Sequence, residues 1–501
     1  MQANRGAPTP PIAFGGAAAT ARPHLDVGSV DVDDAFVARL EGVCSSVTRD
    51  TAAIGEASRD WWPLAMIWAL DDEVGARGSA IAQPGSAEEV AAVLRVCDDA
   101  RVPVTAAAGR SGVCGGSVPV HGGVLLDCCA LRGVVDVDDV SMMLDVGAGT
   151  FGDVLEDELR TTYGVTLGHW PQSVALSTVG GWLACRSAGQ LSTRYGKIED
   201  IVIGLDVALA DGRIVSTGGA PRAAAGPDLT QLFVGSEGTL GVITGARLRL
   251  HPVPTTERRA AYGFDSFAAG LDACRRILRR GATPAVLRLY DDIEGQRNFE
   301  TGPGAHPLLV LDEGDAAVVD GSMTVVREEC TAATSLDDAL VGRWLEHRND
   351  VSALEALVSR GYVVDTMEIS GAWRALPEIY DAATAAIRGV EHTLVASAHQ
   401  SHAYSDGACL YFTFAAQPPA DRREAYYRAA WDAGTRAVLA HGGALSHHHG
   451  VGLNRARYMR EALGPAFDVL VAVKAALDPH GILNPGKLGL PSPFGPSPAW
   501  P

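Results

Sequence analysis

Ala107-Ala108-Gly109-Arg110-Ser111-Gly112-Val113-Cys114-Gly115-Gly116 is the stretch that decides the fold. It joins a strand predicted at 102–106 to a second strand at 124–126, after a helix that begins at Ser86. A glycine-rich loop between two strands presents backbone N–H groups that can cradle a pyrophosphate. The GxGxxG order and the following helix of a Rossmann site are missing, so the sequence disfavours NAD bound in that way.

Two further glycine-rich regions follow along the chain. The second comprises Gly168-His169-Trp170-Pro171-Gln172-Ser173, Ser177-Thr178-Val179-Gly180-Gly181-Trp182 and Arg186-Ser187-Ala188-Gly189. The third, Gly235-Ser236-Glu237-Gly238-Thr239-Leu240-Gly241-Val242-Ile243-Thr244, leads into a strand predicted at 246–250. Between them a strand over 201–208 turns back at Asp211-Gly212, a hairpin dipeptide. Glycine lets a ligand approach the backbone closely, so all three loops are candidates for ligand contact.

Three consecutive histidines stand near the C-terminus, in Gly442-Gly443-Ala444-Leu445-Ser446-His447-His448-His449-Gly450-Val451-Gly452. An ordinary imidazole pKa of ~6.5 suits proton transfer near neutral pH. The alternatives to proton transfer are a surface cluster of histidines and a weak metal site. Adjacent side chains of an extended segment point to opposite faces, so at most two of the three rings can share a pocket. We therefore expect no metal here and leave catalysis open from this stretch alone.

The bulk composition narrows the function classes. The 501 residues carry a net charge of -19 with 47% hydrophobic residues, which is typical of a globular protein and disfavours nucleic acid and anionic membrane as partners. No apolar run reaches the ~18 residues of a transmembrane helix, and no signal-peptide pattern opens the chain. Nine cysteines without a CxxC pair indicate reduced thiols and a cytoplasmic protein.

The two ends of the chain differ in pattern. Residues 1–30 are rich in Ala, Pro and Gly with little apolar periodicity, which predicts a flexible N-terminal arm. Farther along, the sequence predicts an amphipathic helix over 265–279, a strand that ends before Asp291, a strand over 406–414 and a helix over about 421–440. This last helix leads directly to the three histidines.

The three glycine-rich regions, in this order and at these separations, resemble the FAD domain of the vanillyl-alcohol oxidase / p-cresol methylhydroxylase superfamily. Asp478-Pro479-His480-Gly481-Ile482-Leu483-Asn484-Pro485-Gly486-Lys487 resembles its closing motif. The resemblance implies a mixed α/β fold, in which an α+β cap interrupts a two-part FAD-binding domain. The expected units are the arm at 1–30, the FAD-binding domain at 31–255, the substrate or cap domain at 256–440, and a C-terminal segment at 441–501 that completes the active site.

The same resemblance implies which residues hold FAD. They are Ala108, Gly109, Arg110, Ser111 and Gly112 in the first region; Pro171, Gln172, Ser173, Ser177, Thr178, Arg186 and Ser187 in the second; and Glu237, Gly238, Thr239, Gly241, Val242 and Ile243 in the third. Members with covalent flavin commonly carry a histidine in the first loop, where this chain has Val113-Cys114. We therefore expect non-covalent FAD, with a cysteine link as the alternative.

The histidine run resembles the signature of the alkylglycerone-phosphate synthase branch, whereas D-lactate and glycolate dehydrogenases usually carry one histidine with an acidic neighbour. Tyr411 and Arg288 resemble the tyrosine and cap arginine of that branch. The branch performs no net redox: flavin N5 forms an adduct with the substrate's C1, a fatty acid leaves, and a fatty alcohol completes an ether. Proton transfer is then implied for Tyr411 and for His447, His448 and His449, and anion contact for Arg288.

Three of these residues also have purely structural interpretations. Arg288 could instead form a salt bridge with Asp291 or Asp292 in the cap. Tyr411 could be a core aromatic on its strand, and His169 could make a structural hydrogen bond. The residues alone do not decide between these interpretations and the functional ones.

Three positions depart from the branch. Leu354 replaces an arginine, Gln172 an aspartate and Leu453 a lysine, although Arg455 remains. These losses predict that a phosphorylated substrate is a poor one. The resulting expectation is an FAD-dependent transferase that forms an ether bond on the branch's substrate or an altered small molecule, with or without an aliphatic chain. The alternative is an oxidase or dehydrogenase of a hydroxy acid or specialised metabolite. A homodimer stays open.

Overall fold

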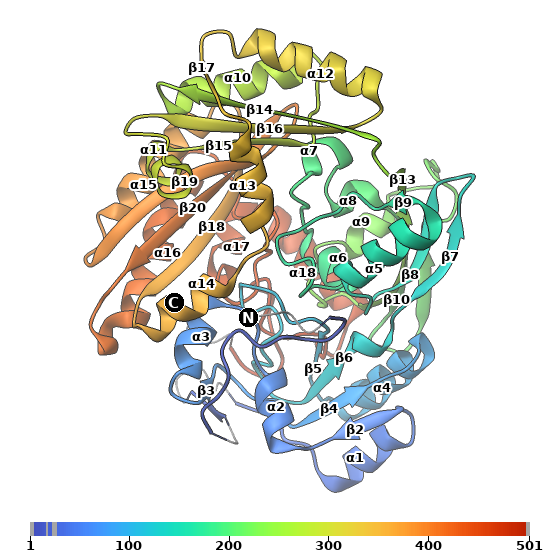
Figure 1. The fold of residues 1–501 in the computed structure, drawn as a ribbon. Coiled ribbons are helices and arrows are strands. Elements are labelled where there is room, and N and C mark those ends of the chain that lie inside the picture. The colour runs from blue at the N-terminus through green and yellow to red at the C-terminus, as the bar shows by residue number, and fades with distance from the viewer. Residues whose placement is uncertain (1–4, 17–18, 23–27, 497–501) are drawn as a thin grey trace.

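The computed structural model describes residues 5–16, 19–22 and 28–496, without the side chains of 352 and 353. Three main sheets are arranged as two halves (Figure 1). The four- and five-stranded sheets, at the bottom and right of the view, form what is called the lower half here, and the seven-stranded sheet, at the upper left, forms the upper half. Both helices and strands occur throughout, so the predicted mixed α/β class is confirmed.

The four-stranded sheet carries the first glycine-rich loop. Its order is β2 (Ser46–Thr48), β4 (Ala80–Gln83), β6 (Val124–Asp127) and β5 (Val104–Ala107), with β4, β6 and β5 parallel. The predicted helix is α4 (Ala87–Ala100), which buries Val90, Leu94 and Cys97 against this sheet. The hydroxyl of Ser86 accepts from the Glu89 N–H at 3.3 Å and caps the helix. The loop therefore leaves the end of β5 and returns to β6 without a helix.

The five-stranded sheet is antiparallel and carries the other two glycine-rich regions. Its order is β11 (Ile214–Thr217), β10 (Val202–Ala208), β12 (Val242–Arg249), β8 (Met143–Gly147) and β7 (Val134–Asp138). The predicted hairpin at Asp211-Gly212 joins β10 to β11. Helices α5 (Gly152–Glu158) and α6 (Val179–Cys185) bury Leu155, Trp182 and Leu183 in the core beside it.

The seven-stranded sheet forms the upper half. Its order is β17 (Thr334–Leu336), β14 (Thr256–Phe264), β16 (His306–Gly314), β15 (Val286–Tyr290), β19 (Thr393–Ala403), β20 (Gly407–Ala416) and β18 (Val363–Ala372). Helices α10 (Phe267–Arg279), α12 (Ala316–Glu329), α15 (Leu376–Arg388) and α16 (Arg423–Ala440) cover its outer side, whereas α13 (Ala339–His347) and α14 (Ser352–Ser359) lie toward the lower half (Figure 1). The helices and strands predicted here from periodicity are present with small shifts in their ends.

The C-terminal segment returns to the first sheet. After α18 (Ala466–Leu477) the chain pairs with β5: the Val104 N–H donates to Ile482 O, and the Asn484 N–H donates to Val104 O, both at 2.8 Å. Lys487 is fully buried and donates to Val118 O at 2.6 Å, at the end of the first glycine-rich loop. The closing motif therefore fixes the geometry of this loop.

The N-terminal segment differs from the predicted flexible arm. Ile12 is buried at 6% exposure, and the Trp61 indole N–H donates to Thr9 O at 2.8 Å. Strand β1 (Thr20–Ala21) pairs in parallel with β3 (Glu73–Val74). The burial of Ile12 and the pairing of β1 with β3 hold this segment against the fold, and composition alone does not predict these contacts. Residues 1–4, 17–18 and 23–27 of this segment lie outside the described residues.

Within the described ranges, no helix has the length and apolar character needed to cross a lipid bilayer.

Candidate active site

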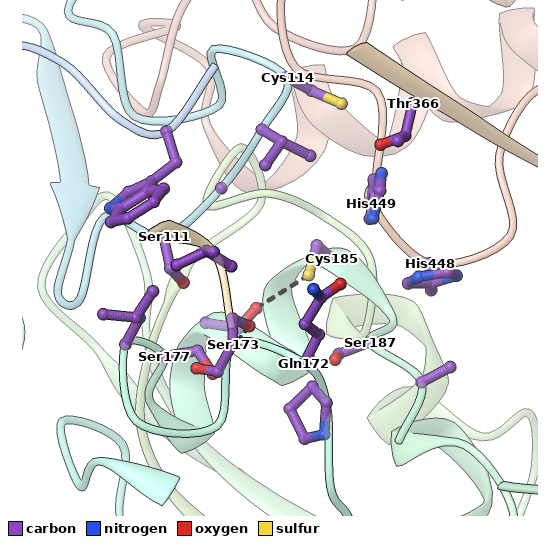
Figure 2. Close-up of a pocket in the computed structure, with 18 of the residues that line it drawn as sticks. Ser111, Cys114, Gln172, Ser173, Ser177, Cys185, Ser187, Thr366, His448 and His449 are labelled. Carbon is purple, nitrogen blue, oxygen red and sulfur yellow. Dashed lines mark hydrogen bonds between the residues drawn. The ribbon is translucent and has the colours of Figure 1, made fainter. Parts of the chain in front are cut away.

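A cavity of about 1040 Å³ lies between the two halves, and all three glycine-rich regions line it. Figure 2 shows Ser111, Ser173 and Ser177 on one side of it and Thr366, His448 and His449 on the other. Most predicted ligand-binding residues reach it: Ala108, Gly109, Arg110, Ser111, Gly112, Pro171, Gln172, Ser173, Ser177, Thr178, Ser187, Glu237, Gly238, Gly241, Val242 and Ile243, together with Arg288, Tyr411, His448 and His449. Sequence patterns far apart in the chain therefore converge on one site.

The first glycine-rich loop presents unused backbone donors to this cavity. Within the described chain, the N–H groups of residues 109–113 have no hydrogen-bond partner. Gly109 is required here because a Cβ on it would lie 2.2 Å from Leu176 O, in the second region. Consecutive unpaired N–H groups form a concave donor surface that suits a pyrophosphate. The loop thus fits an anionic cofactor through its backbone N–H groups.

Glu368 of β18 organises the start of the histidine loop. Its carboxylate accepts from Ser446 Oγ at 2.8 Å, from the His448 and His449 N–H groups at 3.1 and 2.9 Å, and from the His447 N–H. Arg455 Nη1 donates to the same carboxylate at 2.8 Å. Burial alone would raise the pKa of Glu368, but Arg455 and the backbone donors outweigh burial and lower it to about 2. Glu368 is therefore ionised and holds three successive N–H groups toward one point.

Glu237 holds the other end of the same loop. Its carboxylate accepts from the Val451 and Gly452 N–H groups at 2.5 and 2.8 Å. Gly450 has φ +81°, and a Cβ there would lie 2.5 Å from Glu237 Oε1, so only glycine fits. Glu237 lines the cavity as predicted, but its carboxylate oxygens bind the histidine loop. Two carboxylates from the two halves, Glu368 buried and Glu237 half-buried, thus fix the loop between them.

This anchoring separates the three histidines. His448 and His449 line the cavity, which agrees with the argument that at most two rings can share a pocket. His447 is not among the residues that line it, so its catalytic role stays a prediction without support from the cavity. Its Nε2 lies 3.0 Å from Tyr404 OH and its Nδ1 lies 2.8 Å from His448 Nδ1. The alternation of side chains, locked by Glu368, turns this ring behind the cavity wall.

Tyr411 and His449 form the pair best placed for proton transfer. Tyr411 OH lies 3.3 Å from His449 Nε2 and accepts from Thr366 Oγ1 at 3.2 Å. Burial raises the pKa of Tyr411 well above its usual range, and burial lowers the pKa of His449 to about 4. Both groups are therefore neutral near pH 7, and when Nε2 is the unprotonated nitrogen the phenol O–H donates to it and can pass its proton to it.

Arg288 belongs to a second chain of contacts in the cap. Its Nη2 lies 2.6 Å from His399 Nε2, and His399 Nδ1 lies 2.7 Å from Glu294 Oε2. A guanidinium only donates and a carboxylate only accepts, so His399 is neutral with its proton on Nδ1. Burial, with Arg288 adding to it, lowers the pKa of His399 to about 4. The alternative salt bridge to Asp291 or Asp292 does not form, because Asp291 instead caps the next helix.

Sequence reasoning missed the functional parts of β18 and β19. Glu294, Glu368 and His399 were not predicted as site residues, although all are buried and charged or polar. The run His399-Gln400-Ser401-His402 was a usable signal, because a strand places alternate residues on one face. Glu368 carried no such signal, since the Ser446 hydroxyl, the backbone N–H groups and the Arg455 guanidinium that it binds lie 78 or more residues away.

Three other predicted positions differ in the structure. Arg186 ends α6 with φ +59° and lies 3.6 Å from Glu199 in an ion pair, away from the cavity. Thr239 donates its hydroxyl to Ser236 O at 2.7 Å within a tight turn and does not line the cavity. His169 makes no structural hydrogen bond: both ring nitrogens are buried without a partner in the described chain, and the ring lies 4.7 Å from that of Trp182.

The three departures from the branch are not equivalent. Leu354 and Gln172 line the cavity. Leu453 is buried in the hydrophobic core instead, so its loss of charge does not reach a ligand. Arg455 is also unavailable to a substrate, because it is fully buried and bonded to Glu368 and to Leu445 O.

A metal-like cluster lies behind the cavity wall. Single ligand atoms of Glu368, Cys409, His447 and His448 lie within 4.8 Å of one another. The Glu368 oxygens already accept from Ser446, from backbone N–H groups and from Arg455. The guanidinium already neutralises this carboxylate, so the cluster is poorly suited to a metal ion.

Comparison with known proteins agrees with this geometry. Residues 78–218 match the family model described as FAD binding domain, and residues 253–488 match that of FAD linked oxidases, C-terminal domain. The uncharacterized FAD-linked oxidoreductase YgcU of Escherichia coli K12 is 31% identical over 82% of this chain and 88% of its own length. Alkyldihydroxyacetonephosphate synthase of Dictyostelium discoideum is 32% identical over 81% of this chain and 72% of its own length.

The chain is also similar to a relative with a different named activity and to solved structures. Glycolate oxidase subunit GlcD of Bacillus subtilis is 28% identical over 82% of this chain and 88% of its own length. Among solved structures, an alkyldihydroxyacetonephosphate synthase superposes with a TM-score of 0.75 and 26% identity over 94% of this chain and 89% of its own. p-Cresol methylhydroxylase superposes with a TM-score of 0.74 and 17% identity over 91% and 96%, which shows a common fold.

Proposed function

Since the chain belongs to the family of FAD-linked oxidases, within the vanillyl-alcohol oxidase / p-cresol methylhydroxylase superfamily, FAD is its cofactor, and we propose that it is a transferase of the alkylglycerone-phosphate synthase type. In this proposal it exchanges an acyl for an alkyl group and forms an ether bond. The chain is near 30% identical both to a synthase and to a glycolate oxidase subunit, so identity does not distinguish the two reactions. The residues of the site have to distinguish them.

The lower wall of the cavity would hold the cofactor. The unpaired N–H groups of residues 109–113 would bind the pyrophosphate, and the loops at 171–178 and 237–243 would flank the rest. Bound there, FAD supplies the N5 chemistry of the branch. Cys114 lines the cavity, but burial raises the pKa of its thiol well above the ordinary value, which disfavours the nucleophilic thiolate. This supports non-covalent FAD.

The observation that carries the proposal is the Tyr411–His449 pair. A hydroxyl directed at a neutral imidazole nitrogen at 3.3 Å can protonate a departing carboxylate and later accept the proton of an incoming alcohol. Exchange of an acyl for an alkyl group needs both transfers and no net oxidation. His448 also faces the cavity and is a second candidate base.

The upper wall supports a substrate with an aliphatic part. Val351, Leu354 and Leu357 line the cavity near α14 and offer apolar surface. Arg288 has no carboxylate within 4.0 Å in the described chain. It would therefore contact an anionic or carbonyl oxygen of the same substrate.

Oxidation of a hydroxy acid is the second candidate. The neutral His399, oriented by Glu294 and in contact with Arg288, could accept a hydroxyl proton while Arg288 binds the carboxylate. The relatives named as a glycolate oxidase subunit and a D-lactate dehydrogenase have activities of this kind in their names.

We further propose a reducing compartment such as the cytoplasm. All nine cysteines are free thiols, and seven of them are buried. Whether the chain forms a dimer is a separate question that its mass in solution answers.

Anaerobic mixing tests the two candidates against each other. Under the transferase proposal, an acyl dihydroxyacetone phosphate with a fatty alcohol gives an ether product without consumption of an electron acceptor. Under the second candidate, a hydroxy acid bleaches the flavin, and an acceptor restores the colour. A bleached flavin with hydroxy acids and no ether product would refute the transferase. Acid precipitation checks the cofactor: the flavin should stay in the supernatant, and flavin in the pellet would refute non-covalent binding.

A further inference from the structure

Arg348 is one of the cavity-lining cations that the proposed function does not use. It ends α13, where a cation is favoured by the helix dipole. The helix dipole does not explain why the guanidinium is left unpaired. Its Nη1 is buried without a hydrogen-bond partner, and no carboxylate lies within 4.0 Å of it in the described chain. A buried guanidinium donor without a partner is costly, so it indicates a ligand that completes it.

Two tryptophans fix the position of this guanidinium. Arg348 Cζ lies 5.5 Å from the ring centre of Trp344 in the cap and 5.8 Å from that of Trp170 in the lower half. Trp344 also lies 5.7 Å from Arg288 Cζ. Two guanidinium groups therefore contact one indole, and both line the same cavity. Cation–π contacts orient a guanidinium without neutralising it, so its charge remains available to a ligand.

Gln190 adds an acceptor beside Arg348. Its Nε2 donates to Arg348 O at 3.2 Å, and this carbonyl contact fixes which end of the amide is nitrogen. Its Oε1 is buried without a partner in the described chain, and Gln190 lines the cavity. A buried amide oxygen of this kind needs a donor such as a hydroxyl group.

We propose that Arg348 and Gln190 form a subsite for a hydroxylated anion, with Arg348 bound to a phosphate or carboxylate and Gln190 accepting from a hydroxyl of the same molecule. The inference rests on the proposed function only in placing the substrate in this cavity. Because an acyl dihydroxyacetone phosphate has no free hydroxyl, Gln190 would accept from an altered substrate that keeps one. The inference also changes what the loss of an arginine at position 354 means for an anionic substrate. The cation expected at 354 is absent, but Arg348 supplies one six positions earlier, from the end of α13.

Binding to the FAD-loaded enzyme tests the subsite without any turnover. The probes are dihydroxyacetone phosphate, neutral dihydroxyacetone, glycolate, and hydroxyacetone phosphate, which lacks the free hydroxyl. Calorimetry should show that an anionic probe binds at least ~10-fold more tightly than dihydroxyacetone, the lower bound for one charge-assisted hydrogen bond. Phosphate-dependent binding identifies a phosphorylated substrate, and glycolate binding alone identifies a carboxylate.

Variants separate the two residues. Arg348→Met should lose ~10-fold or more in affinity for the anionic probe, Arg348→Lys should lose less, and both should keep the affinity for dihydroxyacetone. Gln190→Met should weaken dihydroxyacetone phosphate but leave hydroxyacetone phosphate unchanged. Arg436→Met, at an exposed arginine paired with Asp432, is the matched control.

Unchanged anion affinity in both Arg348 variants, with normal FAD content, would overturn the subsite. Equal binding of charged and neutral probes by the native enzyme would do the same. Because these readouts need no chemistry, an enzyme that binds the anion but makes no ether would refute only the transferase proposal.

Discussion

The two walls of the cavity use different parts of the chain. The lower wall presents mainly backbone: residues 109–113 offer unpaired N–H groups, and Gly109 allows a contact that a Cβ would block. The upper wall presents side chains from strands and helices of the cap, among them Arg288, His399 and Tyr411. Backbone donors suit a cofactor of constant shape, whereas side chains can change between relatives. The lower wall therefore identifies the cofactor, and the upper wall decides the reaction.

The largest expected effect tests the upper wall. Tyr411→Phe and His449→Ala should each lower turnover by ~10²–10⁴-fold, because each removes one partner of the proton transfer. FAD content should stay normal, since neither residue contributes to the lower wall. Steady-state rates and the flavin absorbance of the purified variants check both statements, and His448→Ala tests the second ring in the same way.

Loss of FAD in these variants would show that Tyr411 and His449 are structural, and the two walls would then not be separable. Undiminished turnover in one variant would remove that residue from the chemistry.

The same contrast explains what the sequence could predict. Glycine-rich loops and the pattern of strands predicted the lower wall, because local backbone requirements appear as glycine at fixed positions such as Gly109. Arg288 and Tyr411 were found only through the family resemblance, whereas the run of histidines was a candidate from its residues alone. Glu368 was missed because its partners, both side chains and backbone N–H groups, lie in a distant segment, and no spacing rule connects them to it. The side to which the His447 ring turns was not predicted, because contacts with Glu368 set the orientation of the loop.

The second prediction concerns the anchor of the histidine loop. Glu368→Gln leaves the fully buried Arg455 without its counter-charge and should cost about 3–5 kcal/mol of unfolding free energy. Urea unfolding measures this loss. The double variant Glu368→Gln/Arg455→Met should recover part of it, because no unpaired charge then remains.

The pH dependence of the same pair gives an independent check. The pKa of Glu368 is lowered to about 2, so its ionisation stabilises the fold above the ordinary glutamate pKa of 4.5, and this contribution is lost as the pH falls toward 2. The native enzyme should lose stability across this range, and Glu368→Gln should lose less. Equal acid sensitivity of both proteins would contradict the assignment.

The third prediction adds a cation to the upper wall. Leu354 lines the cavity, so Leu354→Arg should improve kcat/KM for an acyl dihydroxyacetone phosphate. One charge-assisted hydrogen bond is equivalent to ~10–150-fold, and the lower end is expected because Arg348 already supplies one cation. Leu354→Met controls for the change in shape. Turnover by the native chain as fast as a dedicated ether-lipid synthase, with no gain from the arginine, would mean that the phosphate is already fully bound.

The smallest expected effect is a near absence of change with pH. Burial lowers the pKa of His449 to about 4, so the ring is already neutral across pH 6–8 and able to accept a proton. We expect kcat/KM to vary by less than about twofold in this range and to fall only below about pH 5, when the measured substrate has no group that titrates there. An ordinary histidine with a pKa of ~6.5 would instead be mostly protonated at pH 6 and would lower the rate about fourfold. A midpoint near 6.5 that disappears in His449→Ala would show that water reaches this ring. The upper wall would then not exclude solvent, and the neutral Tyr411–His449 pair would lose its physical basis.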